Sequence, residues 1–518
     1  MDLHDPSSLQ AARVQIPALG KAYPKILNLA YFVTGALLML SFAPTSQFWL
    51  APILVAPLLI SALYSTARSA AWHGFFFGCG LFLAGTYWFY VSIHVFGEAP
   101  LWIAMFLLLC LVLIMGLYYA ATAWIICRLA RGRLAPLVAV ATAVWVLVEW
   151  VRGWFLSGFP WMTLGYSQID SPLAGIAPVA GVYGVSGALL LSTAATLAAV
   201  LPGTTRRRAM YALLAVLPWI LGYFLQPLEW TQPAGAAIRT TIVQGGVSQD
   251  QKWLPEQFPK TLALYRDATL GGRDHELVVW PEVALPAAID QVETYLAAIE
   301  GELASNGQSL LLGILERDFA TGAIYNSVLM LNGRDRQTYR KRHLVPFGEY
   351  FPVPDFIRDW MRLMSLPNTD MTPGAAQQPL LETAAGEKLS VAICYEDAYG
   401  AEQLYALPDA GVLINVSNDA WFGDTIAPHQ HLEIARMRSL ESGRYMVRAT
   451  NNGISAFVDD KGRILESGPQ FEFLSMTRDI PPMSGLTPYA RFGNLPLVLV
   501  LAVIVVAFAA GERQRIRA

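Results

Sequence analysis

The chain has little charge for its length. Only 14% of its 518 residues are Asp, Glu, Lys or Arg, whereas 54% are hydrophobic and the mean hydropathy is +0.41. Soluble domains usually carry about 25% charged residues, so the composition argues against a chain that is soluble throughout. The 36 basic and 39 acidic residues nearly cancel, which excludes a nucleic-acid or other polyanion binder at the level of the whole chain. The composition indicates an integral membrane protein.

Cysteines and nucleotide-binding loops are also scarce. Four cysteines in 518 residues exclude a disulfide scaffold. The polar C-terminal half contains neither a Gly-x-Gly-x-x-Gly loop nor a Walker-type loop. We therefore expect a protein that uses no cofactor.

The few charges are distributed unevenly. Residues 26–226 hold only 11 charged side chains, whereas residues 228–511 hold 33 acidic and 22 basic ones. This contrast predicts three parts: a transmembrane block over residues 1–227, a globular domain over 228–492, and a last transmembrane helix with a basic tail over 493–518.

Eight apolar runs approach the roughly 20 residues that a helix needs to cross a bilayer. They are Ile26–Ala43, Phe48–Tyr64, Ala71–Ser92, Leu101–Ile126, Leu137–Leu156, Ala174–Leu201, Met210–Leu225 and Leu495–Ala510. The first run lacks a small-residue cleavage site after it, which indicates an uncleaved anchor.

The basic residues between these runs predict their orientation. If the N-terminus is cytoplasmic, seven loop arginines lie on the cytoplasmic side and only Arg152 lies on the other. Positive charge favours the cytoplasmic side, so the globular domain is expected outside the cytoplasm. The C-terminal Arg513, Arg515 and Arg517 then return to the cytoplasm, in agreement.

The globular domain alternates short apolar runs with helical patterns. Such a sequence predicts a layered α/β domain with buried sheets. The expected strands are Ile238–Gln244, Leu277–Trp280, Leu310–Leu315, Ser327–Leu331, Leu389–Ile393, Val412–Val416, Tyr445–Ala449 and Ile454–Val458. The expected helices are Pro255–Leu270, Ala288–Ala304 and His429–Ser442.

Polar groups occur at two unexpected places in this domain. Glu282 follows an apolar strand that Pro281 ends, although a loop glutamate exposed to solvent would look the same. Three cations at 340–342, Lys341 among them, precede a segment bent by Pro346 and Gly348. Such a run is more often a solvated edge, so neither feature alone identifies a site.

Cys394 is the only cysteine of the globular domain, so it has no disulfide partner there. It ends a buried strand and precedes Tyr395, Glu396 and Asp397, which resembles a turn that presents a nucleophile. A buried structural cysteine is the alternative. A thiol needs a base, for which Glu282 is suitable. The oxyanion formed by attack on a carbonyl needs donors, for which Lys341 and the Tyr395 N–H are suitable. The three residue types together indicate acyl transfer.

These segments resemble the carbon–nitrogen hydrolase (nitrilase) superfamily and most closely its membrane-embedded branch, the bacterial apolipoprotein N-acyltransferases. The segments that carry this resemblance are Trp280-Pro281-Glu282, residues 341–349 (KRHLVPFGE), Cys394-Tyr395-Glu396 and residues 415–423 (NVSNDAWFG). Seven spans, an external domain and one final span match that branch over essentially the whole chain.

The resemblance implies an αββα sandwich joined to a helical bundle. It implies Glu282 as base, Lys341 as oxyanion stabiliser and Cys394 as nucleophile. Glu349 is then a second carboxylate that positions Lys341, and Tyr395 and Glu396 line the site. Trp253 resembles a substrate-contacting residue on a mobile loop, and Asn326 resembles a further site residue.

The expected substrates are a phospholipid acyl donor, with phosphatidylethanolamine favoured, and the N-terminal amine of a diacylglyceryl apolipoprotein. We expect a monomer in the bacterial inner membrane with a periplasmic catalytic domain. Two alternatives remain. One is a membrane-tethered amidase that uses water. The other is a transporter with a binding domain, which the scarcity of ionisable residues in the spans disfavours.

Three other features are predicted to be structural, with an alternative open for two of them. Glu149 and Arg152 lie one helical turn apart and are read as an ion pair more readily than as a site. His429 and His431 supply too few ligands for a metal, so no metal is expected. Residues 351–364 mix aromatic, Met and Arg side chains, which suits either an amphipathic arm at the membrane interface or a packed surface helix.

Overall fold

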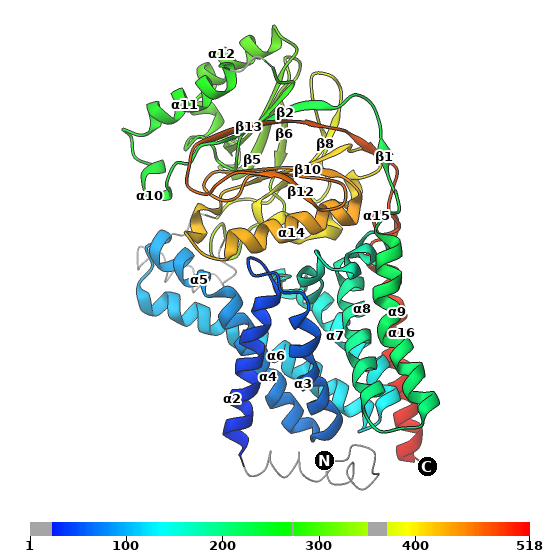
Figure 1. Ribbon diagram of the computed structural model, residues 1–518. Coiled ribbons are helices and arrows are strands. Elements are labelled where there is room, and N and C mark those ends of the chain that lie inside the picture. The colour runs from blue at the N-terminus through cyan, green and yellow to red at the C-terminus, as the bar shows by residue number, and fades with distance from the viewer. Residues whose placement is uncertain (1–22, 272–273, 351–369, 518) are drawn as a thin grey trace. The chain divides into compact units, whose positions relative to one another are not determined.

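The computed structural model describes residues 23–271, 274–350 and 370–517, so the expected arm at 351–364 lies outside the described residues. The chain divides into two compact units (Figure 1). The first takes its described residues from Met1–Leu228, Asp424–Glu433 and Phe492–Ala518. The second takes them from Glu229–Gly423 and Ile434–Arg491.

The first unit is helical, and a helix lies at each of the eight apolar runs. The long helices are α2 (Pro24–Leu38), α3 (Leu50–Tyr64), α4 (Ala67–Thr86), α6 (Leu101–Ala130), α7 (Leu134–Arg152), α8 (Ala177–Val200), α9 (Thr205–Leu225) and α16 (Leu495–Arg517). A short α5 (Trp88–Tyr90) and a π-helical turn (Val91–Phe96) follow α4.

Fewer helices than expected have the length and apolarity of a membrane span. Among the described residues, five helices qualify, and a sixth does if Ala67–Thr86 and Trp88–Phe96, bent by 52°, form one broken span. The apolar stretches Leu50–Tyr64 and Leu495–Gly511 are shorter. Five to six of the described helices therefore have the length and apolarity to cross a membrane, and the expected eight spans are not shown.

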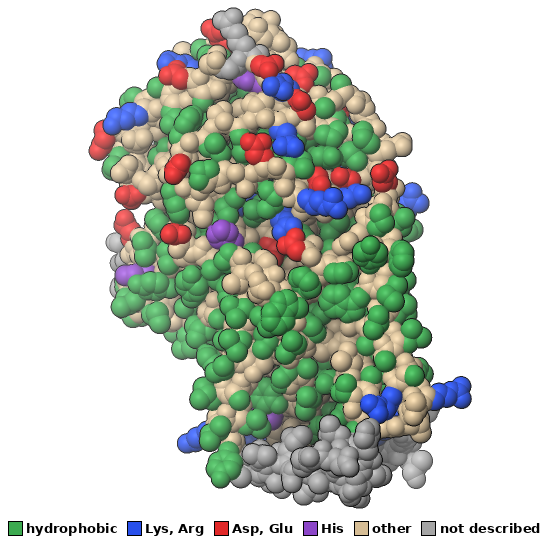
Figure 2. All heavy atoms as spheres, in the orientation of Figure 1, with side chains coloured by type: hydrophobic (Ala, Val, Ile, Leu, Met, Phe, Trp, Pro, Cys, Tyr) green, Lys and Arg blue, Asp and Glu red, His purple; other side chains and the backbone are tan. Residues whose placement is uncertain are grey.

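The helices of the first unit expose large hydrophobic side chains. Hydrophobic side chains dominate the drawn face of these helices, whereas acidic and basic ones are scattered over the second unit (Figure 2). Phe106 on α6, Phe224 on α9 and Val503 on α16 are 59%, 66% and 68% exposed. So much apolar surface is stable only where lipid replaces water, so this is a membrane protein.

Glu149 and Arg152 at the end of α7 are both buried, but they bond to separate partners among the described residues. Glu149 accepts hydrogen bonds from Trp145 Nε1 at 3.1 Å and from the Leu164 N–H at 2.9 Å. Arg152 donates to the carbonyl of Trp161 at 2.6 Å and to Thr163 Oγ1 at 3.2 Å. Their charges therefore hold the loop that follows α7, in place of the expected direct ion pair.

The first unit also includes a segment that lies between two parts of the second unit in the sequence. Helix α14 (Ala427–Ser442) begins in residues 424–433, which belong to the first unit. Gln430 Oε1 accepts hydrogen bonds from Trp161 Nε1 at 2.7 Å and Trp88 Nε1 at 3.2 Å. The Ala43 N–H donates to Glu433 Oε1 at 3.1 Å. These bonds join the start of α14 to the helical unit.

The second unit is built on two six-stranded sheets (Figure 1). The first, in the order β13-β2-β3-β4-β5-β6, contains β2 (Ile238–Gln244), β3 (Leu277–Val279), β4 (Ser309–Arg317), β5 (Ile324–Leu331), β6 (Gln337–Arg340) and β13 (Leu474–Ile480). The second, in the order β12-β11-β10-β9-β8-β7, contains β7 (Leu381–Glu382), β8 (Lys388–Ile393), β9 (Val412–Ser417), β10 (Tyr445–Thr450), β11 (Ala456–Val458) and β12 (Ile464–Ser467). A short pair, β1 (Gln232–Pro233) and β14 (Met483–Ser484), lies apart.

Two apolar cores hold the sheets and helices in layers. One core lies between the sheets and joins residues such as Ile242 and Leu311 to Ile393 and Val416. The other packs the outer face of the first sheet against α11 (Phe258–Leu270) and α12 (Glu293–Ala304). In Figure 1 these helices lie on the far side of the first sheet, and α14 runs along the second. The sandwich is therefore the αββα arrangement that the sequence resemblance implies.

The strand directions bring the polar segments to one region. Strands β2, β3 and β4 are mutually parallel, as are β8, β9 and β10. In the second sheet Ile393 pairs with Val416, so β8 and β9 end at the same edge. Carboxyl ends of parallel strands are where α/β folds place reactive groups. Glu282, Cys394 and Asn418 all follow such ends.

Candidate active site

Glu282 is held just beyond β3. Its side chain is 9% exposed, and the Asn418 N–H donates to its Oε2 at 2.8 Å. The turn passes close to β4, because a Cβ built at Gly313 would lie 2.5 Å from the Pro281 carbonyl oxygen and 2.6 Å from Glu282 Cα. Glycine at 313 therefore leaves the space that the backbone of Pro281 and Glu282 occupies.

Lys341 follows β6 and is 1% exposed. Its ammonium donates to Glu349 Oε1 at 2.8 Å and to Glu282 Oε1 at 3.4 Å. Burial by itself lowers the pKa of Lys341, but the carboxylates of Glu349 and Glu282 outweigh burial and raise it above its ordinary value. Lys341 is therefore a permanent cation between two carboxylates.

Asn326 on β5 links the same two carboxylates. Its Nδ2 donates to Glu282 Oε1 at 2.7 Å and to Glu349 Oε1 at 2.8 Å. The Lys341 N–H donates to the Asn326 carbonyl at 2.8 Å, which fixes the lysine backbone on the same residue. Glu349 Oε2 also accepts from the Val345 N–H at 2.8 Å. One amide, one ammonium and two carboxylates thus form a closed network, called here the lysine cluster.

Cys394 begins a tight turn at the end of β8. Its φ is 53°, a left-handed conformation that a residue with a Cβ rarely adopts. The turn continues as a 3-10 helix over Cys394–Ala398. Burial raises the pKa of the Cys394 thiol, the carboxylate of Glu282 raises it further, and Lys341 lowers it. The resting thiol is therefore neutral, and it needs a base when it reacts.

Glu396 lies beneath the site and is fully buried. Its Oε2 accepts from the Ile393 N–H at 2.7 Å and from the Tyr339 hydroxyl at 2.9 Å. Its Oε1 accepts from the Arg342 N–H at 2.6 Å. Burial raises the pKa of this carboxyl and Arg342 offsets part of the rise. One side chain therefore fixes the end of the cysteine strand to the segment that carries Lys341.

Tyr395 and Trp253 differ in their surroundings. Tyr395 is 9% exposed and its ring lies edge-on to Tyr399, with centroids 5.1 Å apart. Trp253 follows α10 (Gln249–Lys252) and is 53% exposed. Tyr395 is thus packed against its neighbours, whereas more than half of Trp253 is open to solvent.

A second ionic network lies beneath the cysteine turn and was not predicted from the sequence. Arg448 on β10 donates to Asp419 Oδ2 at 2.9 Å, to Asp397 Oδ2 at 3.2 Å and to Asn415 Oδ1. Arg448, Asp397 and Asp419 are all 0% exposed at their side chains. We call these residues the arginine cluster. Asn415 Nδ2 also donates to the Cys394 carbonyl at 3.3 Å, so this cluster supports the turn of the thiol.

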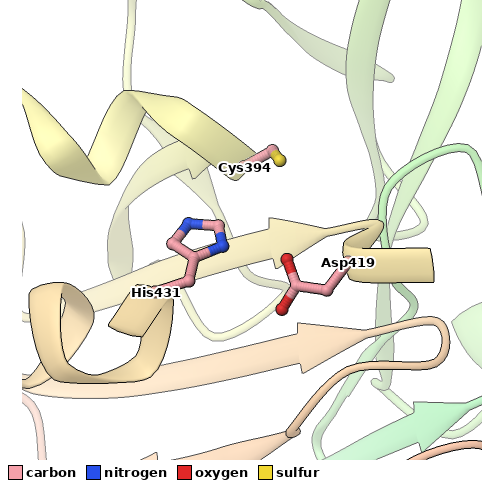
Figure 3. A group of neighbouring side chains, drawn as sticks. All are labelled: Cys394, Asp419 and His431. Atoms are coloured by element: carbon pink, nitrogen blue, oxygen red, sulfur yellow. The ribbon is translucent and has the colours of Figure 1, made fainter. Parts of the chain in front are cut away.

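Figure 3 shows Cys394 and Asp419 at two neighbouring strand ends, and His431 on α14. The Cys394 Sγ and a carboxylate oxygen of Asp419 lie within 4.8 Å. These two belong to the second unit, whereas His431 belongs to the residues of the first. Two ligands are fewer than the three or four that a zinc site uses. The expectation that the protein holds no metal stays a prediction.

Comparisons with known proteins agree with this geometry. The family model of the apolipoprotein N-acyltransferase N-terminal domain matches residues 34–195, and that of carbon-nitrogen hydrolase matches residues 239–484. An apolipoprotein N-acyltransferase of Azotobacter vinelandii is 42% identical over 95% of this chain and 96% of its own. That of Methylococcus capsulatus is 41% identical over 93% and 95%. The chain belongs to the apolipoprotein N-acyltransferase family.

Membership of the apolipoprotein N-acyltransferase family makes the chain a bacterial membrane acyltransferase with a carbon–nitrogen hydrolase domain. A solved structure to which it is similar is an amidase of the nitrilase superfamily from Nesterenkonia, 17% identical over 51% of this chain and 97% of that one, with a TM-score of 0.37.

Within this acyltransferase, some of the residues singled out from the sequence are joined by hydrogen bonds and others are not. Glu282, Lys341, Glu349 and Asn326 share hydrogen bonds, and Cys394 lies within reach of their charges. Sequence reasoning missed Arg448 and Lys252. The only signal for Arg448 was a charge inside an apolar strand.

Proposed function

We propose that this protein moves the sn-1 acyl chain of a phospholipid, phosphatidylethanolamine being the expected donor, to the N-terminus of an apolipoprotein. The acyl group travels as a thioester on Cys394, and the acceptor is the α-amine of an S-diacylglyceryl-cysteine. The names of the relatives support lipoprotein N-acylation. The observation that carries the chemistry is the buried Lys341 ammonium, bonded to Glu282 and Glu349 beside a thiol on a strained turn.

In the first half-reaction Glu282 takes the thiol proton as the sulfur attacks the sn-1 ester carbonyl. The oxyanion that forms is stabilised by the Lys341 ammonium and the Tyr395 N–H, each such donor contributing about 3 kcal/mol. As the tetrahedral intermediate collapses, the ester C–O bond breaks and Glu282 returns the proton to the departing glycerol oxygen. Lysophospholipid leaves and the thioester stays on the enzyme.

In the second half-reaction the lipoprotein amine attacks the thioester carbonyl. Glu282 accepts a proton from the amine, the C–S bond breaks as the amide forms, and Glu282 passes that proton to the departing Cys394 sulfur. An amide is more stable than a thioester, so this half needs no nucleotide or other cofactor. The neutral resting thiol fits this scheme, because proton transfer to Glu282 accompanies attack.

The supporting residues have distinct roles in this scheme. Glu349 and Asn326 position Lys341 and Glu282, and Glu396 holds the cysteine turn to the lysine segment. Trp253, whose side chain is half-exposed, contacts the acyl chain or headgroup. The site uses no metal.

We also propose eight spans, a monomer and a periplasmic catalytic domain. Six candidate spans and the shorter apolar stretches Leu50–Tyr64 and Leu495–Gly511 together supply the eight. Residues 1–227 then form the membrane block, 228–492 the catalytic domain and 493–518 the last span with its tail. The arginines of alternate loops support this orientation in the inner membrane.

A two-substrate assay tests the proposal. Purified protein is incubated with phosphatidylethanolamine labelled in its sn-1 chain and a synthetic S-diacylglyceryl-cysteine peptide. We expect label in an amide at the peptide N-terminus, one lysophospholipid per amide, and no product from Cys394→Ala. Labelled fatty acid released as fast without the peptide as with it would favour the amidase-type hydrolase and contradict the transfer. Transfer of a label placed in the sn-2 chain would contradict the proposal that the sn-1 chain is the one moved.

A further inference from the structure

Lys252 is, like Lys341, a buried lysine of the second unit, and no step of the scheme above uses it. It is the last residue of α10 and is 1% exposed, and among the described residues its ammonium has no hydrogen-bond partner. A buried ammonium without a partner costs several kcal/mol. Such a group is retained at a cost in stability unless a ligand supplies the missing partner.

The charge of Lys252 interacts with that of Glu282, the proposed base. The carboxylate of Glu282 is the charge that acts on Lys252: burial lowers the pKa of this lysine to about 8, and Glu282 offsets part of the fall. The ammonium is therefore still mostly protonated at pH 7. Among the described residues Glu282 forms its ion pair with Lys341, at 3.4 Å, so the charge of Lys252 is not consumed by that carboxylate.

The segment that carries Lys252 is tied to the site by its neighbours. Asn418 Nδ2 donates to Gln249 Oε1 on α10 at 3.1 Å, and the Asn418 N–H donates to Glu282 Oε2 at 2.8 Å. Asn452 Nδ2 donates to the Val247 carbonyl at 2.9 Å. The helix that ends at Lys252 is thus bonded to Asn418, which also holds the base, and the half-exposed Trp253 follows Lys252 in the chain.

The charge balance of the site indicates what binds there. The carboxylates of Glu282 and Glu349 and the ammonium of Lys341 give the lysine cluster a net charge of about −1. By itself this charge repels the anionic phosphate of a donor. Lys252 brings the sum to zero. A glycerophospholipid such as phosphatidylethanolamine carries a phosphodiester anion a few bonds from its sn-1 ester, and a lysine ammonium is a common binding group for phosphate.

We propose that the Lys252 ammonium binds the phosphodiester of the phospholipid donor and so places the sn-1 ester carbonyl against Cys394. The proposal rests on the proposed function, because it assumes a phospholipid donor. It makes Lys252 a donor-binding residue that distinguishes phospholipids from neutral glycerides, whereas Lys341 serves the oxyanion.

The test compares two donors that share the sn-1 ester and differ in the phosphate. Single-turnover formation of the Cys394 thioester is measured from phosphatidylethanolamine and from 1,2-diacylglycerol in detergent micelles. The variants are Lys252→Met, which removes the charge at similar volume, and Lys252→Arg, which keeps it. Lys260→Met, an exposed lysine on α11, is the matched control. Exchange of a buried unpartnered charge for an apolar side chain should not lower the thermal stability.

We expect Lys252→Met to lower the apparent affinity for phosphatidylethanolamine about 10- to 100-fold, as loss of one charge-assisted hydrogen bond implies. The rate from diacylglycerol should stay within about twofold, Lys252→Arg should recover most of the loss, and Lys260→Met should behave as wild type. Glycerophosphate should compete in wild type and lose that competition in Lys252→Met.

Other results would overturn the inference. Equal slowing with both donors would mean that Lys252 acts on Glu282 and not on phosphate, and no change with either would mean that it binds no donor. Wild-type protein that forms no thioester from any donor would refute the proposed function itself. This result concerns the wild type alone, so it is distinct from every outcome for the Lys252 variants.

Discussion

The lysine cluster and the arginine cluster of the catalytic unit are built from the same parts and behave differently. Each holds one cation, two carboxylates and one asparagine. In the arginine cluster every charged side chain is 0% exposed. In the lysine cluster Glu282 and Glu349 keep 9% and 11% exposure. The arginine cluster is therefore closed to solvent, whereas the lysine cluster keeps partial access to it.

The choice of cation follows from these surroundings. The guanidinium of Arg448 is a rigid fork that bonds Asp397, Asp419 and Asn415 at once. The ammonium of Lys341 is a compact point charge, suited to a developing oxyanion as well as to Glu349. The comparison indicates that arginine makes a scaffold here and lysine makes a reactive centre. Substitutions in the two clusters should therefore separate stability from activity.

The largest effect is expected for Arg448→Met. Loss of the guanidinium leaves Asp397 and Asp419 buried without a cation, which should lower the free energy of unfolding by about 3 to 5 kcal/mol. Thermal unfolding monitored by circular dichroism measures it. Arg463→Met, at an exposed arginine of the same unit, should change stability by less than about 0.5 kcal/mol. Equal stability of the two variants would refute a scaffold role.

Lys341→Met should act mainly on catalysis. We expect thioester formation to slow by about 100- to 1,000-fold, because one oxyanion donor is lost. The unfolding free energy should fall less than in Arg448→Met, since Glu282 and Glu349 keep 9% and 11% exposure to water. Single-turnover kinetics and thermal unfolding of the same preparation separate the two effects. Retention of the wild-type rate would remove Lys341 from the mechanism.

Gly313→Ala tests how closely the base must be placed. The new Cβ would lie 2.5 Å from the Pro281 carbonyl oxygen, so the Glu282 turn must shift, and a displacement of about 1 Å costs about 100-fold in rate. Gly301→Ala on α12 is the matched control, because nothing lies within 4 Å of its Cβ. That variant should keep the wild-type rate. Similar rates for the two alanine variants would show that the turn is not constrained.

The smallest effect concerns the pH dependence of the resting thiol. Burial and Glu282 raise the pKa of Cys394, so its thiolate fraction at any given pH is below that of a free cysteine. Alkylation of Cys394, followed by mass spectrometry of its peptide, should be slow at pH 7 and rise about tenfold per pH unit up to pH 9. Lys341 lowers this pKa, so Lys341→Met should slow alkylation several-fold. A rate that is flat over this range would indicate a preformed thiolate.

Much of the fold could be predicted from the sequence, because buried strands and long apolar helices leave continuous hydrophobic runs. The strand Ile238–Gln244 was predicted at its observed bounds, and seven others overlap their predictions. The edge strand Leu474–Ile480 was missed, since its residues alternate between buried and exposed and include Thr, Arg and Asp. The division of α14 between two units leaves no local pattern and was also missed.

The residues of the candidate site also divide into those that the sequence predicts and those that it does not. Glu282, Lys341 and Cys394 stand in recognisable segments at strand ends, so chemistry and resemblance both single them out. Arg448 and Lys252 resemble ordinary charged residues in the sequence, because their burial depends on strands and loops far along the chain. The place of Glu396 beneath the site likewise depends on bonds to residues 339–343, more than 50 positions away.

The central claim is that the lysine cluster makes Cys394 carry the acyl group. The most direct measurement is the intact mass of the purified protein after incubation with phosphatidylethanolamine alone. We predict one added acyl chain, located on the Cys394 peptide, removed by hydroxylamine and by the lipoprotein amine, and absent in Glu282→Gln. Transfer to the peptide without any acyl adduct, or with the adduct on another residue, would contradict the claim.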